Sequence, residues 1–193
     1  HHASALFSAF AGAEDNWIYL PDDPPADFAA YRAWAEKVAA RADPLFHALI
    51  DKEAGHAGGV AALMRIDRAN GVIEVGNVNY APEFKRTKAA TEAIFLFASR
   101  VFDELGYRRF EWKCDSLNAA SRRAALRYGF SFEGIFRQAV VYKARNRDTA
   151  WFAMIDRDWP RLQAGYARWL DPANFDAAGR QRESLAACLD AGG

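Results

Sequence analysis

Three cationic side chains stand directly before an apolar, helix-forming stretch of the chain. The segment reads Lys85-Arg86-Thr87-Lys88-Ala89-Ala90-Thr91-Glu92. The first turn of a helix carries backbone N–H groups without intrahelical acceptors, and the helix dipole adds partial positive charge there. Such an end binds anions, phosphate groups among them. The segment therefore predicts a site for a phosphate-bearing ligand, and the alternative is a solvated basic loop in front of a core helix.

A second polar pattern begins a later helix. Asn118-x-x-Ser121 is followed at fixed spacing by Gly129-Phe130-x-Phe132-Glu133-Gly134. Asn and Ser are both good residues for the start of a helix, because their side chains accept hydrogen bonds from free backbone N–H groups. Capping alone explains these two residues, and contact with a ligand at the same helix end is the alternative.

The elements that would position these residues alternate between helices and strands. Apolar periodicity predicts helices over 26–41, 90–105, 118–128 and 158–170, and strands over 45–50, 59–66, 72–80, 108–114, 132–143 and 149–155. The pair Asn70-Gly71 predicts a hairpin between the second and third strands. Asn146-Arg147-Asp148 predicts the turn of the last hairpin. This order indicates a mixed α/β domain with a central sheet.

Length and composition exclude several classes of protein. The 193 residues suffice for one domain with a substantial core, and 25 Lys and Arg balance 25 Asp and Glu. A net charge of zero gives no support for a nucleic-acid or membrane surface. Two cysteines, Cys114 and Cys188, cannot form a disulfide framework, and neither they nor the four histidines have the spacing of a metal site. No membrane span and no signal peptide is predicted, so we expect a cytoplasmic protein without a metal, with a homodimer as the commonest assembly.

Together the strand 72–80, the basic segment with its helix, and the Asn118 to Gly134 pattern resemble the GNAT acetyltransferase superfamily. Within it, the chain is similar to the branch of ribosomal-protein N-terminal (alanine and serine) acetyltransferases. The resemblance covers roughly residues 15–160 and implies a GNAT-like fold, with a central, largely antiparallel sheet flanked by helices. We expect one acetyltransferase domain over 1–170, with a less regular C-terminal tail over 171–193 that packs partly on the domain. The resemblance also implies acetyl-CoA as the acetyl donor.

The resemblance also implies which residues bind the coenzyme. The family's motif begins with Gln or Arg and has Gly, then Gly or Ala, at its fourth and sixth positions, where this chain has Lys85, Lys88 and Ala90. Backbone amides from Arg86 through Thr87, Lys88, Ala89 and Ala90 to Thr91 would then hold the pyrophosphate. The third strand would bind the pantetheine near Val78 and Tyr80, and Asn118 and Ser121 would contact the coenzyme arm. Lys88 is a departure, since a Cβ and a long side chain replace the usual glycine.

Catalytic residues follow less directly from the resemblance. Many members carry a thiolate-protonating Tyr at the position of Ala125, and Tyr128, three residues later, is predicted to belong to the core. Ser121, a water or no side chain would then serve as the acid. For the base, Glu74 leads because burial in an apolar strand would raise its pKa, with Glu111 second. Glu74 as a surface residue paired with an Arg is the alternative.

Two further groups of residues have open roles. Cys114 could carry an acetyl group, but a buried structural thiol is the preferred interpretation because no His lies near it in sequence. Arg145, Arg147 and Asp148, with Arg137, either bind an acidic acceptor or, as we favour, stabilise the hairpin through ion pairs. Aromatic side chains that could line an acceptor pocket are those of Trp17, Trp112 and Trp151, and packing in the core is the alternative.

Direct transfer of the acetyl group to an amine in a ternary complex is the leading prediction for function. The acceptor is a protein N-terminus or a small amine. A non-catalytic coenzyme-A-binding module with a sensing or scaffold role is the alternative. An RNA-associated factor that uses the basic segment is the weakest hypothesis, because the net charge is zero.

Overall fold

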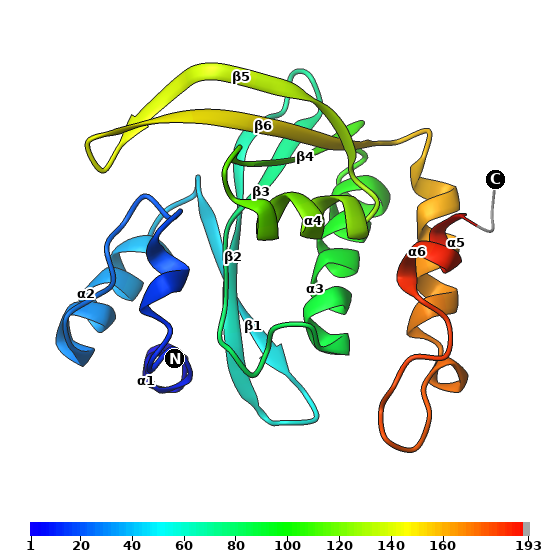
Figure 1. Ribbon diagram of the computed structural model, residues 1–193, viewed down its shortest axis with the longest axis horizontal. Coiled ribbons are helices and arrows are strands. Elements are labelled where there is room, and N and C mark those ends of the chain that lie inside the picture. The colour runs from blue at the N-terminus through cyan, green and yellow to red at the C-terminus, as the bar shows by residue number, and fades with distance from the viewer. Residues whose placement is uncertain (191–193) are drawn as a thin grey trace.

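The computed structural model describes residues 1–190 and has a six-stranded sheet with helices on both faces (Figure 1). The strand order is β1-β2-β3-β4-β6-β5, in which β3 and β4 are parallel and all other neighbours are antiparallel. The strands are β1 (Leu45–Asp51), β2 (His56–Asp67), β3 (Val72–Tyr80), β4 (Arg109–Asp115), β5 (Ser131–Tyr142) and β6 (Arg145–Ile155). The predicted mixed α/β class and largely antiparallel sheet are confirmed.

Six α-helices cover this sheet. They are α1 (Ala3–Ala9), α2 (Phe28–Ala39), α3 (Lys88–Ser99), α4 (Ala119–Arg127), α5 (Trp159–Leu170) and α6 (Leu185–Asp190). A π-helical turn, Arg100–Glu104, extends α3, and two short 3-10 turns lie at Glu14–Trp17 and Pro172–Asn174. Within residues 1–190, no helix has the length and apolar character needed to cross a membrane.

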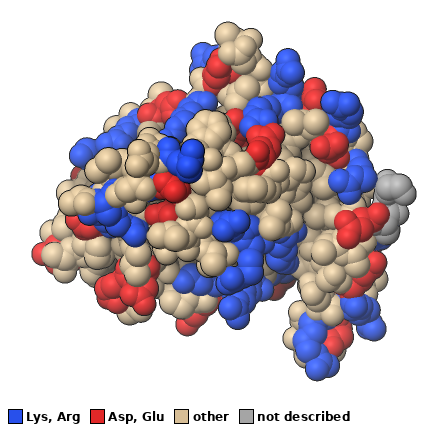
Figure 2. Space-filling model, turned by 45° about the horizontal axis from the view of Figure 1, so that its top comes forward, with Lys and Arg blue, Asp and Glu red and all other residues tan. Residues whose placement is uncertain are grey.

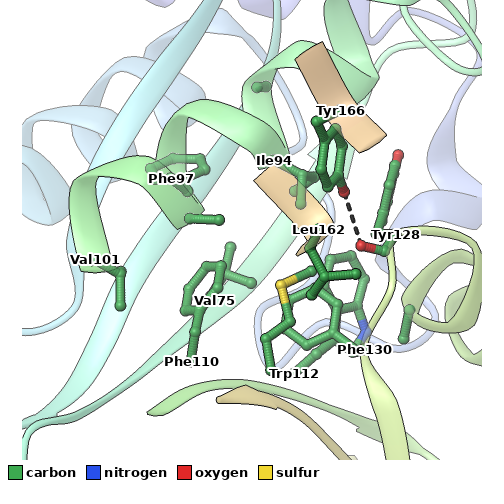
Figure 3. Packing of buried hydrophobic residues seen from close by; sticks show 14 of the residues in the cluster. Val75, Ile94, Phe97, Val101, Phe110, Trp112, Tyr128, Phe130, Leu162 and Tyr166 are labelled. Carbon is green, nitrogen blue, oxygen red and sulfur yellow. Dashed lines mark hydrogen bonds between the residues drawn. The ribbon is translucent and has the colours of Figure 1, made fainter. Parts of the chain in front are cut away.

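Two hydrophobic clusters hold the layers together, one on each face of the sheet. The larger places side chains of β3, β4 and β6 against α3 and α5, with Ile94, Phe110 and Tyr166 almost completely buried (Figure 3). The smaller joins α1, α2 and the turn around Trp17 to Val60 of β2. Alternate residues of a strand point to opposite faces of the sheet. The odd-numbered apolar side chains of β3 and the even-numbered apolar side chains of β4 therefore pack in the larger cluster. The intervening residues, among them Glu74 and Lys113, face the α1–α2 side.

The structure corrects several predicted boundaries. The central helix α3 begins at Lys88 rather than Ala90, because Thr87 caps it. The turn between β5 and β6 lies at Lys143 and Ala144, both with positive φ, so the predicted turn residues 146–148 are part of β6. Helices α1 and α6 were not predicted.

The segment after residue 170 packs onto α5. Leu185, Cys188 and Leu189 of α6 are buried in the main cluster. Gly165 of α5 permits this contact, since a Cβ there would lie 2.8 Å from the Cys188 carbonyl oxygen. The division into a domain over 1–170 and a tail over 171–193 stays a prediction, and residues 191–193 lie outside the described residues.

Candidate active site

The basic segment forms a tight turn that leads into the N-terminus of α3. Thr87 Oγ1 accepts a hydrogen bond from the Ala90 N–H (3.1 Å) and donates one to the Phe84 carbonyl (2.8 Å). Arg86 adopts a left-handed backbone conformation with φ of 65°. Among residues 1–190, no acceptor is present for the backbone N–H groups of Arg86, Lys88 and Ala89. Consecutive N–H groups in such a turn form a concave anion site. Of the predicted amides, that of Thr87 donates to the Phe84 carbonyl (3.5 Å) and that of Ala90 is satisfied by the cap.

The cationic side chains of this turn have no carboxylate partner within residues 1–190. Lys85 Nζ lies 2.5 Å from the Asn16 Oδ1 atom, and Arg86 is exposed. Lys88 Nζ lies 4.9 Å from the centre of the Phe175 ring, so its side chain extends toward the C-terminal segment. No ion pair to any of the three is found in the described part of the chain. Figure 2 shows Lys and Arg gathered in one group near the middle of the lower part of the face drawn, while both signs are interspersed elsewhere.

Strands β3 and β4 separate beside this turn. They are paired only from Val72 with Arg109 to Val75 with Trp112. Beyond that point β3 bulges, since Ala62 and Val60 of β2 face Gly76 and Asn79, and a left-handed Asn77 (φ of 50°) lies between them. A bulge bends its strand, so backbone groups of β3 past Gly76 are turned away from β4. The parting of the two strands leaves their facing backbone edges unpaired.

The predicted pantetheine residues lie along this parted segment. Val78 and Tyr80 are half-buried and pack against the main cluster. The Tyr80 carbonyl accepts a hydrogen bond from Asn16 Nδ2 (2.8 Å), and its hydroxyl points to the Ala90 carbonyl of α3 (3.4 Å). Burial raises the pKa of Tyr80 well above its usual value, with the neighbouring Tyr128 acting in the same direction. Tyr80 therefore links β3 to the start of α3 as a neutral phenol.

Asn118 and Ser121 lie on the other side of the opening, at the start of α4. Asn118 Oδ1 accepts a hydrogen bond from the Ser121 N–H (3.0 Å), so the predicted cap is confirmed. Ser121 Oγ accepts a hydrogen bond from Trp112 Nε1 (2.9 Å). Since the indole fills an acceptor position, the hydroxyl proton of Ser121 is directed elsewhere. Trp112 thereby has a structural partner, and its ring packs in the core.

The position at which the family resemblance implies a tyrosine is apolar in this chain. Ala125 is completely buried, and Tyr128 is 6% exposed in the core, as predicted. The Tyr128 carbonyl accepts a hydrogen bond from the Tyr166 hydroxyl (2.8 Å), as Figure 3 shows. Burial raises the pKa of the Tyr128 phenol. Ser121 is the hydroxyl that the fold brings to the opening from α4.

Glu74 is buried as predicted, yet its surroundings are charged rather than apolar. Its side chain is 3% exposed and bonds through both oxygens to Arg65 Nη1, at 2.8 and 2.7 Å. Lys113 Nζ lies 3.1 Å from Glu74 and 2.6 Å from Glu111. Glu111 also pairs with Arg109 at 2.6 Å. The prediction of an apolar environment for Glu74 is wrong, because cations from β2 and β4 reach the same face of the sheet.

We call this row of alternating charges the charge ladder. Its members come from β2, β3, β4 and β5, and the row ends where Arg109 of β4 reaches past β6 to bind Glu133 of β5. That contact lowers the pKa of the Glu133 carboxyl. Its members are Arg65, Glu74, Lys113, Glu111, Arg109 and Glu133. Each carboxylate in the ladder has a cation beside it.

Cys114 and the last hairpin complete the surroundings of the opening. Cys114 is buried, and burial raises the pKa of its thiol, which opposes nucleophilic reactivity. Arg145 Nη2 lies 2.5 Å from the Tyr142 hydroxyl and 3.8 Å from the Asp115 carboxylate. Asp148 accepts hydrogen bonds from the Gln138 N–H and from Asn146 instead of pairing with an Arg.

Two residues of this region were missed by sequence reasoning. Asn79 and Thr149 are both buried polar residues, 3% and 5% exposed, on the α1–α2 side of the sheet. Asn79 Oδ1 accepts a hydrogen bond from Asn16 Nδ2 (2.8 Å). Neither residue stands in a recognisable motif. Only the pairing of distant strands brings them beside the opening.

Comparison with known proteins identifies the family of this site. Residues 1–131 match the model of the acetyltransferase (GNAT) domain, so the chain belongs to the GNAT acetyltransferase family. Its structure is similar to that of a GCN5-related N-acetyltransferase from Brucella melitensis, with 52% identity, a TM-score of 0.95, and coverage of 98% of this chain and 86% of that chain. A probable acetyltransferase of the GNAT family from Chromobacterium violaceum is 46% identical, with a TM-score of 0.77 over 83% of this chain and 80% of that chain. No curated protein gives a significant match.

The assignment to the ribosomal-protein branch of the family rests on a weaker similarity. A candidate ribosomal-protein-serine acetyltransferase from Vibrio cholerae has a TM-score of 0.68 and 16% identity, over 79% of this chain and 87% of that chain. At that identity the likeness shows the fold alone. Membership of the ribosomal-protein branch therefore stays a prediction, whereas membership of the superfamily is confirmed.

Proposed function

We propose that this protein transfers the acetyl group of acetyl-CoA to an amine, by direct attack in a ternary complex. The observation that carries the proposal is the opening between β3 and β4, which lies directly beside a helix N-terminus with unpaired N–H groups. The family's use of acetyl-CoA supports the choice of donor. In this arrangement the pyrophosphate binds the turn at Arg86, Lys88 and Ala89. The pantetheine follows β3 past Val78 and Tyr80, as an added strand follows a free edge.

The chemical step needs a nucleophile, a proton acceptor and a proton donor. A neutral amine nitrogen attacks the thioester carbonyl carbon, a C–N bond forms, the C–S bond breaks, and the coenzyme thiolate takes up a proton. Ser121 is the proposed donor. Its oxygen accepts from Trp112 Nε1, and its hydroxyl proton, which has the Cys114 sulfur within hydrogen-bond reach, would turn to the coenzyme sulfur. Asn118 holds this end of α4 in place and contacts the coenzyme arm.

Glu74 is the proposed proton acceptor for the incoming ammonium group. It lies one residue before the last paired position of β3, on the face opposite α3. One Arg65 nitrogen bridges both carboxylate oxygens, so the Arg65 side chain must move aside before an ammonium group can take that position. The Arg65 side chain is 57% exposed and can return to water, while Lys113, 8% exposed, stays in place. Glu111 is less accessible as a base because both of its partners, Arg109 and Lys113, are largely buried.

Steady-state kinetics with a panel of amines test this function. Release of coenzyme A that depends on both acetyl-CoA and an amine would support it. Tight acetyl-CoA binding without turnover on any amine would favour the second candidate, a coenzyme-binding module without catalysis. Lys88 in place of the family's glycine is the observation that favours that candidate. The nature of the amine, a protein N-terminus or a small molecule, the cytoplasmic location and a homodimer all remain predictions.

A further inference from the structure

Strand β6 carries a row of polar side chains whose buried donors have no acceptor in the described part of the chain. Arg147, Thr149 and Trp151 alternate along the strand and therefore share the face opposite α3. Arg147 Nε, Thr149 Oγ1 and Trp151 Nε1 are buried atoms without a hydrogen-bond partner in residues 1–190. A buried donor left unpaired costs about 1–3 kcal/mol, so most are satisfied by protein, water or ligand. Three in succession on one face point to an absent group that accepts hydrogen bonds.

Arg147 is the cation in this row that no carboxylate neutralises. Asp115 accepts from the Tyr142 hydroxyl (2.9 Å) and lies within ion-pair distance of Arg145. The acidic residues further along this face belong to the charge ladder and pair with its cations. No ion pair or hydrogen bond of the Arg147 guanidinium is found among the described residues, and its nearest aromatic contact is the Tyr142 ring at 5.8 Å. A half-buried guanidinium in this situation favours an anionic partner.

This row lies next to the proposed position of the thioester. Thr149 and Trp151 are paired in register with Asp115 and Lys113, which are the residues of β4 beyond its last pair with β3. Arg147 is also near enough to Cys114 for its charge to lower the pKa of that thiol, against the larger effect of burial. Opposite Arg147 and Thr149, β5 bulges by two residues between Phe136 and Val140. The row therefore borders the opening through which the amine would enter.

The segment after Trp17 covers the same region from outside. Lys143 Nζ donates to the Trp17 carbonyl (2.8 Å), and Arg145 Nη2 donates to the Ile18 carbonyl (3.2 Å). The hairpin of β5 and β6 is thus tied to the chain between α1 and α2. A ligand bound to the β6 row would be enclosed on two sides, in surroundings where a charge-assisted hydrogen bond is stronger than in water.

We propose that Arg147 and Thr149 bind a carboxylate of the acetyl acceptor, so that the substrate is a small amine that also carries a carboxylate. A guanidinium and a hydroxyl supply hydrogen bonds to both carboxylate oxygens, and the carboxylate itself is unchanged when the amine nitrogen is acetylated. Trp151 Nε1 serves a further acceptor atom of the same molecule. This inference rests on the proposed acetyltransferase function and deepens it.

Matched pairs of amines test the inference directly. Each amino acid of a panel is compared with its carboxamide and with its decarboxylated amine, at saturating acetyl-CoA. We expect the free carboxylate to have a kcat/KM about 10- to 100-fold above that of the amide, the range given by one charged hydrogen-bonded pair. Arg147→Gln should remove this preference, Arg147→Lys should restore part of it, and Thr149→Val should reduce it. Arg137→Gln removes a cation from the same hairpin and should leave the preference intact.

A binding measurement keeps the inference separate from the question of turnover. N-acetyl amino acids and their amides are titrated calorimetrically into the wild-type protein saturated with coenzyme A. Tighter binding of the carboxylates, lost in Arg147→Gln, supports the carboxylate site even if no amine is acetylated. Equal binding of carboxylates and amides would overturn it. Faster acetylation of peptides that have a free N-terminus and a C-terminal amide than of amino acids would also overturn it. In that last outcome the acetyltransferase function would stand and only the acceptor class would fall.

Discussion

The basic turn before α3 and the charge ladder use the same residue types in opposite ways. In the turn, Lys85, Arg86 and Lys88 have no carboxylate partner among residues 1–190, and backbone N–H groups beside them lack acceptors. In the ladder, Lys113 and its neighbours satisfy one another within the fold. Cations left without a carboxylate partner can bind an anionic ligand, whereas cations already paired stabilise the fold or hold a carboxylate in position. The basic turn is therefore the place where we expect an anion to bind, and the charge ladder holds the charges whose removal should destabilise the fold.

The largest effect that this comparison predicts is on stability. Lys113→Met leaves Glu74 and Glu111 buried with one cation fewer between them, and should lower the free energy of unfolding by about 3–5 kcal/mol. Lys85→Met in the turn is the matched control and should change it by less than about 0.5 kcal/mol. Urea unfolding followed by circular dichroism measures both. Equal losses for the two variants would remove the distinction between the regions.

Glu74 belongs to the ladder and is also the proposed base, so its substitution sharpens the comparison. Glu74→Gln should lower kcat about 100-fold, within the range for loss of a general base, with an unchanged Kd for acetyl-CoA. Arg65→Met frees the carboxylate and should leave kcat close to that of the wild type. Rapid-quench kinetics on the folded protein give both values. If Glu74→Gln unfolds more easily yet turns over normally, Glu74 serves only the ladder.

Features set by neighbouring residues in the chain, such as the basic turn, could be predicted from the sequence, whereas features set by strand pairing, such as the charge ladder, could not. The hairpin at Asn70-Gly71 was predicted correctly because its signal lies within two adjacent residues, with Gly71 at φ of 62°. The hairpin between β5 and β6 was misplaced because Lys143 and Ala144 have positive φ without the Asn or Gly that usually marks such a turn. The basic turn is likewise a local pattern.

The partners of Glu74 could not be predicted, since they are set by strand pairing. Arg65 lies nine positions and Lys113 thirty-nine positions away in the chain, and only the register of β2, β3 and β4 brings them together. The unpaired donors on β6 were missed for the same reason. The sequence of a strand shows which of its residues share a face. It does not show which residues of the neighbouring strands lie beside them.

Asn118 combines both kinds of role, a bond within the fold and a proposed contact with the coenzyme. Asn118→Ala removes the bond to the Ser121 N–H and should cost about 1 kcal/mol of stability, with weaker acetyl-CoA binding. Asn118→Asp keeps the capping oxygen and loses the amide donor, so it should keep stability and still bind acetyl-CoA more weakly. Thermal unfolding and calorimetric titration separate the two effects. Normal affinity in the Asp variant would make Asn118 a cap alone.

The smallest effect is expected at Cys114, whose thiol is buried in the main hydrophobic cluster and belongs to neither region. Burial is the largest influence on its pKa and raises it, so at neutral pH the thiolate, the nucleophilic form, is scarcer than for an exposed cysteine. Cys114→Ser should therefore turn over close to the wild-type rate. Iodoacetamide should modify Cys114 far more slowly in the folded protein than in urea, as followed by peptide mass spectrometry. An acetyl group found on Cys114 after acid quench would replace direct transfer by a covalent intermediate. It would also mean that the opening between β3 and β4 exposes this thiol when the coenzyme binds, because a buried thiol with a raised pKa cannot attack the thioester.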